Sequence, residues 1–274
     1  MSSVRSPEKM RSRLRPGLPR GWRDAVLQLA LWGLADLLYE GVRGVVAGHG
    51  DLALANAERI VSLERATHTL WEPRLQSLVI GHHDVIVAAN WLYVNVQFTV
   101  NALFLALLYA YRNHIFYFVR NMFFVAMAIA LTVHLLLPVA PPRMLPRLGF
   151  VDTIRQVAHV NQDSGAVSLF VNPYAAVPSM HMCFALLVGF TVMRLVRRRR
   201  RWLKALALTY PLLVAAVVIA TANHFLLDIV AGALTAVLAA LAAQQVMARV
   251  RPVAWAWAQH TVGPQPVSSL GQAR

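Results

Sequence analysis

Residues 203–247 read LKALALTYPLLVAAVVIATANHFLLDIVAGALTAVLAALAAQQVM, and this stretch decides the class of the fold. It holds two apolar runs, 203–221 and 224–247, which are separated by a short junction around Thr221 to Asn223. A helix needs about 20 mostly apolar residues to cross a bilayer, so each run is long enough to do so. The stretch therefore predicts two membrane-spanning helices that run in opposite directions.

The rest of the chain has the same character. Of its 274 residues 58% are hydrophobic and only 14% are charged, whereas a soluble domain carries about a quarter charged residues. Four further apolar runs lie at 24–47, 84–110, 119–139 and 179–196. We therefore predict an all-α, polytopic membrane protein with a six-transmembrane-helix bundle. The first run is interrupted by Asp36, Glu40 and Arg43, whose spacing places them on one helical face.

The basic residues predict the orientation of these helices. The net charge of +14 alone would also suit a nucleic-acid binder, but 19 of the 26 basic residues lie in or beside the segments 1–23, 111–118, 197–202 and 248–274. Lys and Arg concentrate in cytoplasmic segments near span ends. We therefore expect a multi-pass plasma-membrane protein that binds no nucleic acid. We expect residues 1–23 to be a basic cytoplasmic tail, 24–250 to be the catalytic membrane domain, and 251–274 to be a disordered cytoplasmic tail.

Two longer segments, 48–83 and 140–178, then lie on the outer side. Residues 52–81, LALANAERIVSLERATHTLWEPRLQSLVIG, have apolar side chains at helical spacing. This pattern predicts an interfacial helix between the first two spans.

Three polar groups interrupt the apolar spans at their outer ends. Arg143 follows the prolines of LLLPVAPPRML, residues 135–145. Ser179 and His181 open the fourth helix, and His224 and Asp228 stand four residues apart at the start of the sixth. The alternation of spans places all five residues on the same side of the membrane.

These residue types suit phosphoryl transfer without a metal or another cofactor. A neutral imidazole, here His224, can attack phosphorus when a carboxylate such as Asp228 fixes its tautomer. A second imidazole, His181, can protonate the departing alkoxide. Arg143, Ser179 and the free backbone N–H groups at the helix start can bind the phosphoryl oxygens. The predicted intermediate is a phosphohistidine.

Arg143 after a double proline, PSMH at 178–181 and HFLLD at 224–228 resemble the three signature motifs of the type 2 phosphatidic acid phosphatase superfamily. The resemblance implies a six-helix membrane bundle that acts without metal on lipid phosphates. It also implies His224 as nucleophile, His181 as acid and Asp228 as the partner of His224.

Three positions depart from the superfamily's usual pattern. Leu136 and Val218 stand where a lysine and an arginine are usual, and Met180 stands where a glycine is common. Fewer cations favour a phosphodiester over a dianionic phosphomonoester. The pattern is similar to the bacterial branch that resembles inositol phosphorylceramide synthases.

The sequence thus predicts a lipid phosphatase or phosphotransferase at the extracytoplasmic face. The donor is a phospholipid or polyprenyl phosphate, and the acceptor is water, a sugar alcohol or a lipid hydroxyl. Two alternatives are a non-catalytic binder or transporter of lipid phosphate and a bis-histidine haem protein. Among other polar residues, His134 is expected to be a core histidine. The stripe Asn90, Tyr93, Gln97 and Asn101 is expected to form interhelical hydrogen bonds or to line a headgroup site.

Overall fold

The computed structural model describes residues 18, 20–157, 174–197 and 199–247. In chain order the main helices are α2 (Gly21–Val46), α3 (Gly50–Ala66), α4 (Glu72–Ile80), α5 (His83–Trp91), α6 (Gln97–Tyr111), α7 (Asn113–Leu136), α8 (Thr153–Val157), α10 (Met180–Leu195), α11 (Arg201–Ala220) and α12 (Leu226–Ala242). Every regular element of the described residues is a helix, beside one isolated bridge between Val139 and Ala175. The all-α prediction is therefore confirmed, while the predicted tail at 251–274 and most of that at 1–23 lie outside the described residues.

Short irregular helices connect the longer ones. A π-helical segment, η3 (Leu92–Val96), joins α5 to α6 into one continuous rod, and a second one, η6 (Ala243–Met247), extends α12. Three 3-10 turns, η2 (Ala47–His49), η4 (Pro142–Met144) and η5 (Pro146–Leu148), lie in the connections.

Among the described residues, four helical rods are long and apolar enough to cross a membrane: His83–Tyr111, Asn113–Leu136, Arg201–Ala220 and Leu226–Gln245. Of the two other predicted spans, α10 has 16 residues, which at 1.5 Å per residue is shorter than the roughly 30 Å hydrocarbon core. The second, α2, has 26 residues, but its charged side chains lower its hydropathy. The described residues thus show a membrane-type helical protein with four candidate spans.

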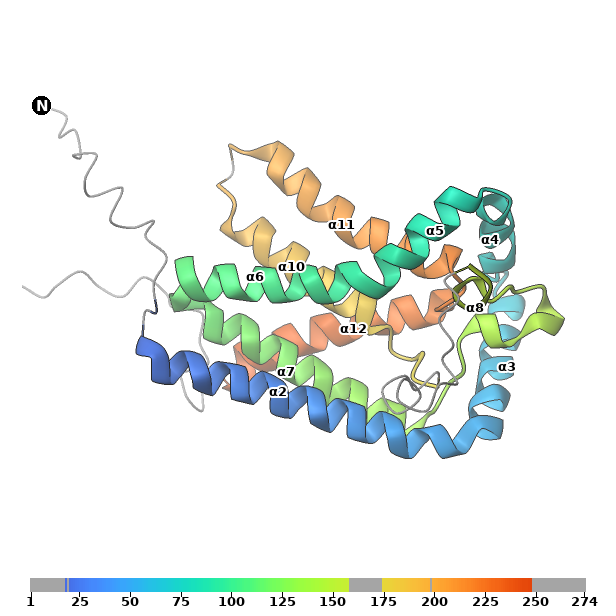
Figure 1. The fold of residues 1–274 in the computed structure, drawn as a ribbon, viewed down its shortest axis with the longest axis horizontal. Helices are drawn as coiled ribbons and strands as arrows, with labels where there is room; N and C mark the ends of the chain where they lie inside the picture. Colours follow the sequence, from blue (N-terminus) through green and yellow to red (C-terminus); the bar gives the residue numbers. More distant parts are fainter. Residues whose placement is uncertain (1–17, 19, 158–173, 198, 248–274) are drawn as a thin grey trace, which may run out of the picture.

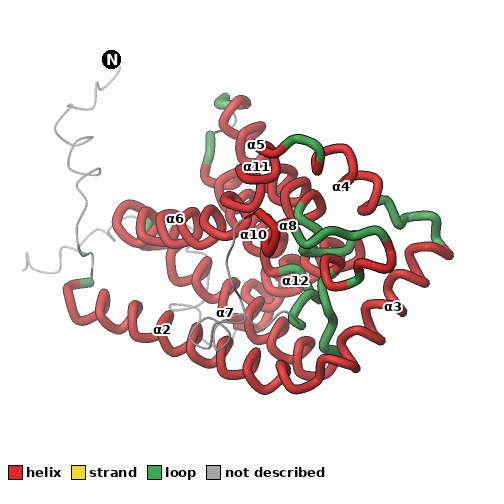
Figure 2. Tube along the Cα trace, turned by 45° about the vertical axis from the view of Figure 1, so that its right-hand side comes forward, coloured by secondary structure: helices red, strands yellow, loops and turns green. Residues whose placement is uncertain are grey.

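The rods lie side by side, with α7 in the centre (Figure 1). On one side of α7 lies α2, and on the other lie α10 and α12, with α11 packed against α10. The same order is visible after a 45° turn (Figure 2). Large apolar side chains on the outer faces remain exposed, among them Leu37, Leu103 and Leu212. Such surfaces suit a hydrocarbon solvent, because apolar side chains pointing outward gain nothing from water.

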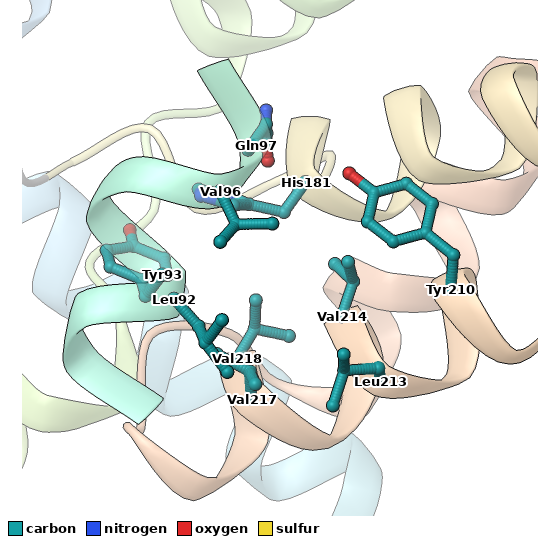
Figure 3. Close-up of a pocket in the computed structure, with 10 residues that line it drawn as sticks. All are labelled: Leu92, Tyr93, Val96, Gln97, His181, Tyr210, Leu213, Val214, Val217 and Val218. Atoms are coloured by element: carbon teal, nitrogen blue, oxygen red, sulfur yellow. The ribbon is translucent and has the colours of Figure 1, made fainter. Parts of the chain in front are cut away.

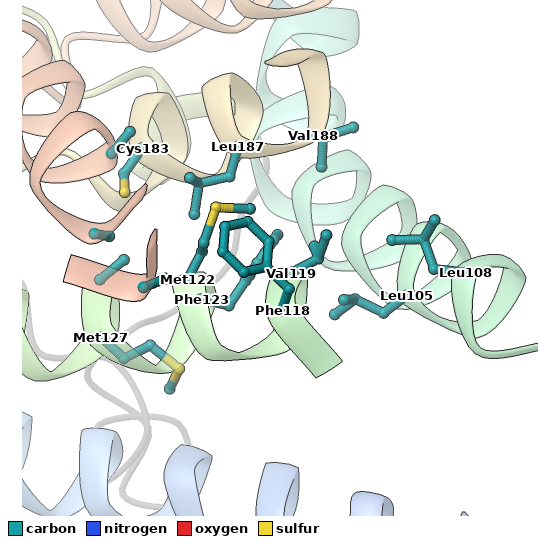
Figure 4. Packing of buried hydrophobic residues seen from close by; sticks show 14 of the residues in the cluster. Leu105, Leu108, Phe118, Val119, Met122, Phe123, Met127, Cys183, Leu187 and Val188 are labelled. Atoms are coloured by element: carbon teal, nitrogen blue, oxygen red, sulfur yellow. The ribbon is translucent and has the colours of Figure 1, made fainter. Parts of the chain in front are cut away.

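The larger apolar core fills the space between α7, α10 and α12 (Figure 4). Phe123 of α7 stacks on Phe184 of α10 with ring centroids 4.8 Å apart, and Leu187 lies beside them. At Gly189 the backbone of α10 approaches α11 so closely that a Cβ there would lie 2.8 Å from the Ala207 carbonyl oxygen. This packing fixes the helix that carries His181.

At one end of the bundle, α3 crosses the ends of the rods, transverse to α2 (Figure 1). Its buried face, which includes Ala53, Ala57 and Val61, packs on Val139 and Phe225 in a second apolar cluster. The Asn56 side chain donates to the Pro138 carbonyl, and the Ala53 carbonyl accepts from the Ala140 N–H. Helix α3 therefore packs against the loop that follows α7 and the loop that precedes α12.

Several predicted boundaries were wrong. The third span begins at Asn113 instead of residue 119, because Ile115, Phe116 and Phe118 are buried in the core, and only Arg112 separates α6 from α7. It ends at Leu136, before Pro138, since proline cannot continue the helix.

The segment 52–81, predicted as one helix, forms two. Helices α3 and α4 are separated at Thr67 to Trp71, where His68 has a left-handed φ of 57° and Thr69 N–H donates to the Glu64 carbonyl. A regular helix cannot pass through a left-handed residue, so the chain turns there.

Candidate functional site

The His224 imidazole and the Asp228 carboxylate form a buried pair. His224 Nδ1 lies 3.3 Å from Asp228 Oδ2, and both side chains are almost fully shielded. The same oxygen accepts the Phe225 backbone N–H at 2.8 Å. With Nδ1 facing the carboxylate, Nε2 is the nitrogen left for reaction.

The structure corrects where His224 stands. It was predicted on the sixth helix, but α12 begins at Leu226, so His224 lies in the preceding turn. Helix α11 ends at Ala220, and Ala222 takes a left-handed φ of 50°, which reverses the chain. The Asn223 and His224 N–H groups both donate to the Val218 carbonyl. The turn, rather than helical spacing, brings the imidazole to Asp228.

The start of α10 lies directly against the start of α12. Ser179 caps α10, with its Oγ 3.4 Å from the Met182 N, and its own N–H donates to the Asp228 carbonyl at 3.0 Å. Gly232 makes this approach possible, because a Cβ there would clash with the Ser179 carbonyl oxygen. The two helix starts are thus held together through backbone contacts.

This contact brings the two histidines together. The ring centroids of His181 and His224 are 5.6 Å apart, and the rings are tilted by 58°. On its other side His181 stacks on Tyr93 of η3, with centroids 4.4 Å apart and an interplanar angle of 17°. The Tyr93 ring therefore fixes the plane of the His181 imidazole.

Arg143 reaches the same place from the loop after α7. Its guanidinium Nη1 donates to Asn223 Oδ1, its Nε lies 3.7 Å from Asp152 Oδ2, and its backbone N–H donates to the Ala222 carbonyl. Asn223 is itself held by the Thr221 hydroxyl. The planar guanidinium is thus fixed beside the turn that carries His224.

Burial lowers the pKa of His224 to about 3, and the positive charge of Arg143 adds to this, although a hydrogen bond to the Ala176 backbone acts in the opposite direction. Loss of water solvation disfavours the charged imidazolium, as does a neighbouring cation. His224 is therefore neutral at physiological pH, which is the form that can act as a nucleophile.

A long open groove begins at the two histidines. It has a volume of about 780 Å³ and runs between α2 and α6, with α7 and α10 as its floor. Its lining comes from one face of α6, including Gln97, Asn101 and Leu105, and from one face of α2, including Leu29 and Trp32. The groove is mostly apolar and reaches Tyr109 near the far end of α6.

A second, much smaller cavity of about 20 Å³ lies behind His181 (Figure 3). It is bounded by Val96 and Gln97 on one side and by Tyr210, Val214 and Val218 of α11 on the other. This volume holds about one water molecule, so the two cavities differ in what they can accept.

The other sequence candidates lie at varied distances from this centre, and Tyr93 is in direct contact with it. Asn90 binds the Thr153 hydroxyl and carbonyl, which supports the interhelical interpretation for that residue. Tyr93, Gln97 and Asn101, from the same stripe, line the groove instead. Asp36 also faces the groove, whereas the side chains of Glu40 and Arg43 lie outside the described part of the chain. His134 is buried and forms an edge contact with Tyr39.

Sequence reasoning missed four residues around the site: Asn223, Asp152, Glu64 and Glu72. Glu64 and Glu72 are both fully buried and accept backbone N–H groups from the start of α12. For Glu64 the sequence held a signal, because this residue falls on the same face of α3 as Ala53, Ala57 and Val61. A carboxylate on the buried face of a helix needs a partner.

Comparison with known protein families gives one match. Residues 58–242, from α3 to the end of α12, match the PAP2 superfamily. No curated protein and no solved structure matches the chain. The matched range covers more than half of the chain and contains Arg143, Ser179, His181, His224 and Asp228. The chain belongs to the PAP2 superfamily.

Proposed function

We propose that this protein is a membrane-embedded, metal-independent lipid phosphatase or phosphotransferase that works through a phosphohistidine on His224. Membership in the PAP2 superfamily supports an enzyme of the phosphatase or phosphotransferase type. The observation that carries the proposal is the pair of imidazoles, one backed by a buried carboxylate, at the mouth of an apolar groove.

In the first step His224 Nε2 attacks phosphorus while Asp228 holds Nδ1–H. The N–P bond forms, the bond from phosphorus to the leaving oxygen breaks, and that oxygen takes a proton from His181. The ring centroids of the two imidazoles are 5.6 Å apart, so one phosphoryl group can contact both, with its phosphorus facing His224 and its leaving oxygen facing His181. Charge that develops on the phosphoryl oxygens is stabilised by Arg143 and by the N–H groups of the α10 start.

In the second step an acceptor hydroxyl gives its proton to His181 and attacks phosphorus. The new O–P bond forms as the N–P bond breaks, and His224 returns to the neutral imidazole. Water as acceptor completes a hydrolysis, and an alcohol completes a transfer. The same two histidines serve both outcomes.

The groove supports a lipid as the donor. Between Tyr93 and Tyr109 it follows 16 residues of helix, which corresponds to about 24 Å. This length is slightly less than the thickness of a bilayer's hydrocarbon core, which is about 30 Å. A phosphate bound at the histidines therefore leaves its hydrocarbon chain in the groove between α2 and α6.

We further propose six crossings, with α2 and α10 added to the four candidate spans and α3 and α4 lying at the outer interface. The transverse course of α3 at the end that holds the site supports this arrangement (Figure 1). The chain termini are then cytoplasmic and the site faces the extracytoplasmic side, in the plasma membrane.

For the acceptor we favour an alcohol over water, as in the branch that resembles inositol phosphorylceramide synthases. Leu136 and Val218 support this preference, because they leave the site without the two cations that a dianionic phosphomonoester favours. The acceptor would then be a sugar alcohol or a lipid hydroxyl.

The test uses purified protein in lipid nanodiscs with EDTA present. Phosphatidate, a polyprenyl diphosphate and a phosphatidylinositol are each supplied, with and without an alcohol acceptor, and free phosphate and new lipid products are measured. We expect product formation that is lost in His224→Ala. Rapid release of free phosphate without an acceptor would overturn the transferase preference.

The same preparation tests the two alternatives. Binding of lipid phosphate with no turnover of any of these donors would favour a non-catalytic binder. A Soret band that disappears in both His181→Ala and His224→Ala would favour a bis-histidine haem protein.

A further inference from the structure

Two carboxyl groups from outside the catalytic motifs meet at the start of α12. Glu64, at the end of α3, accepts the Leu227 N–H through Oε1 at 2.9 Å, and Glu72, at the start of α4, accepts the Leu226 N–H through Oε1 at 2.6 Å. Their side chains have 0% and 1% of their surface exposed. Fully buried carboxyls are rare in proteins and need partners.

The two carboxyl groups also interact with each other. The negative charge of Glu72 raises the pKa of Glu64, and within the described residues neither Oε2 atom has a hydrogen-bond partner. Two carboxyl groups can share a hydrogen bond only if one of them keeps its proton. A proton kept by Glu64 would let these two buried oxygens satisfy each other.

Electrostatics agrees with a retained proton on Glu64. Burial raises the pKa of Glu64 to about 8, and the negative charges of Glu72 on α4 and Asp228 on α12 add to the rise, while the Leu227 N–H opposes it. With one proton kept, the pair carries one negative charge beside Asp228 instead of two. Repulsion among the three carboxyl groups is reduced accordingly.

Three successive N–H groups at the start of α12 have carboxyl partners. Phe225 donates to Asp228, Leu226 to Glu72 and Leu227 to Glu64. The first N–H groups of a helix have no intrahelical acceptor, and elsewhere they often bind anions. Here they are already occupied, which leaves phosphate binding to Arg143 and the α10 start.

We propose that Glu64 and Glu72 are positioning residues that hold the segment His224 to Asp228 in its reactive geometry through the Leu226 and Leu227 N–H groups. This inference rests on the proposed phosphohistidine function. Neither residue lines the groove, and the pair acts through the backbone of Leu226 and Leu227, which lie between the nucleophile and its carboxylate partner.

The consequence for catalysis follows from the position of these two amides. If either carboxyl is removed, an N–H at a buried helix start loses its acceptor, and the turn that carries His224 is less firmly held. A displacement of about 1 Å at the reacting groups costs on the order of 100-fold in rate. Arg143 and the groove are unchanged, so binding of the lipid is retained.

The test compares alanine and glutamine variants with the matched control Glu58→Gln, which changes an exposed carboxyl on the same helix α3. We measure kcat and KM per folded molecule in nanodiscs, together with the thermal unfolding midpoint. Glu64→Ala and Glu72→Ala should each lower kcat by on the order of 100-fold, with KM within about twofold of the parent. Glu58→Gln should match the parent protein in both constants.

A proton kept by Glu64 predicts a specific pattern among the glutamine variants. In Glu64→Gln or Glu72→Gln the amide oxygen still accepts its backbone N–H, and the amide nitrogen donates to the remaining carboxylate. Each single variant should therefore keep kcat within about threefold. In the double variant two amide nitrogens face each other with no acceptor between them, and kcat should fall as in the alanine variants.

Two results would overturn the inference. One is a kcat near the parent value in both alanine variants, or in the double glutamine variant if the alanine variants do not fold. The other is a rise in KM at constant kcat, which would place the pair in substrate binding. Activity that persists in His224→Ala would instead defeat the proposed function, so the two failures are distinguishable.

Discussion

Asp228 has two partners that make its carboxylate hard to replace. One oxygen, Oδ2, faces His224 Nδ1 and also accepts the Phe225 N–H. An amide in its place can present its N–H₂ to the imidazole, which favours the tautomer with the proton on Nε2. The nucleophilic nitrogen is then blocked.

We therefore expect Asp228→Asn to lower kcat by roughly 10³-fold to 10⁴-fold, with the protein still folded. Steady-state turnover of the lipid donor in nanodiscs measures the change, and Asp84→Asn, at an exposed carboxyl on α5, serves as the control. A loss below tenfold would show that Asp228 does not orient the nucleophile.

A second prediction for a single residue concerns Gly232. A methyl group at this position would meet the Ser179 carbonyl oxygen, which belongs to rigid backbone. We expect Gly232→Ala to separate α10 from α12, with a fall in both kcat and the unfolding midpoint. The matched control is Gly33→Ala in α2, where a Cβ meets no atom within 4 Å. That change should stabilise α2 by roughly 0.5–1 kcal/mol. Equal behaviour of the two variants would contradict the close contact.

Single residues also show how far sequence reasoning reaches. His181, His224 and Asp228 stand out because ionisable side chains are rare in apolar runs. Asn223 and Asp152 do not stand out, because each lies in an irregular loop and only the folded chain brings it to Arg143. Their partner lies 80 positions away in one case, which no local pattern contains.

At the level of helices, the burial of Glu64 at the end of α3 has an electrostatic consequence. The folded protein keeps the Glu64 proton up to a pKa of about 8, whereas the unfolded chain loses it near 4.5. Between these values the folded state binds more protons, so stability falls as pH rises, by up to about 1.4 kcal/mol per pH unit.

His224 has the opposite effect in a lower pH range. Its pKa falls from 6.5 to about 3, so the unfolded chain binds more protons there and stability rises with pH up to about 6.5. The contribution of Glu64 is therefore clearest between pH 6.5 and 8. We expect the unfolding midpoint of the parent protein to fall more steeply across this interval than that of Glu64→Gln. Thermal unfolding in nanodiscs measures both, and parallel curves would exclude a retained proton on Glu64.

The helices were predicted with unequal success. The apolar runs predicted the long helices, because the bilayer sets the number of apolar residues that a spanning helix needs. Helices α11 and α12 agree closely with the runs at 203–221 and 224–247. The start of α7 was missed because His114 and Arg120 lower the local hydropathy, although their neighbours pack into the core. The break between α3 and α4 was missed because its left-handed residue is a histidine, and not the glycine that usually marks such a turn.

At the scale of the whole molecule, a groove separates α2 from α6 in the described part of the chain. Helix α2 packs on α7, and the space between α2 and α6 forms the groove. Individual helix patterns did not predict this groove, because the sequence shows which face of a helix is apolar but not whether that face meets protein or lipid.

The groove makes a prediction on substrate length. We expect Ala102→Trp, which fills the groove halfway along α6, to raise KM for long-chain lipid donors at least tenfold. A short-chain donor should be unaffected, because its phosphate still reaches the histidines. The control is Leu103→Trp on the outward face of the same helix, where the side chain is 58% exposed. Equal effects of both variants on long-chain donors would show that the chain lies elsewhere.

The most direct test of the central claim is the trapping of a phosphorylated His224. The donor, labelled with ³²P in the phosphate that is transferred, is mixed with the His181→Ala variant in nanodiscs, quenched in alkali, and digested for mass spectrometry. We predict acid-labile, alkali-stable label on the peptide that contains His224, and none in His224→Ala. Turnover by the parent protein with no label on His224, or with label on another residue, would contradict the account.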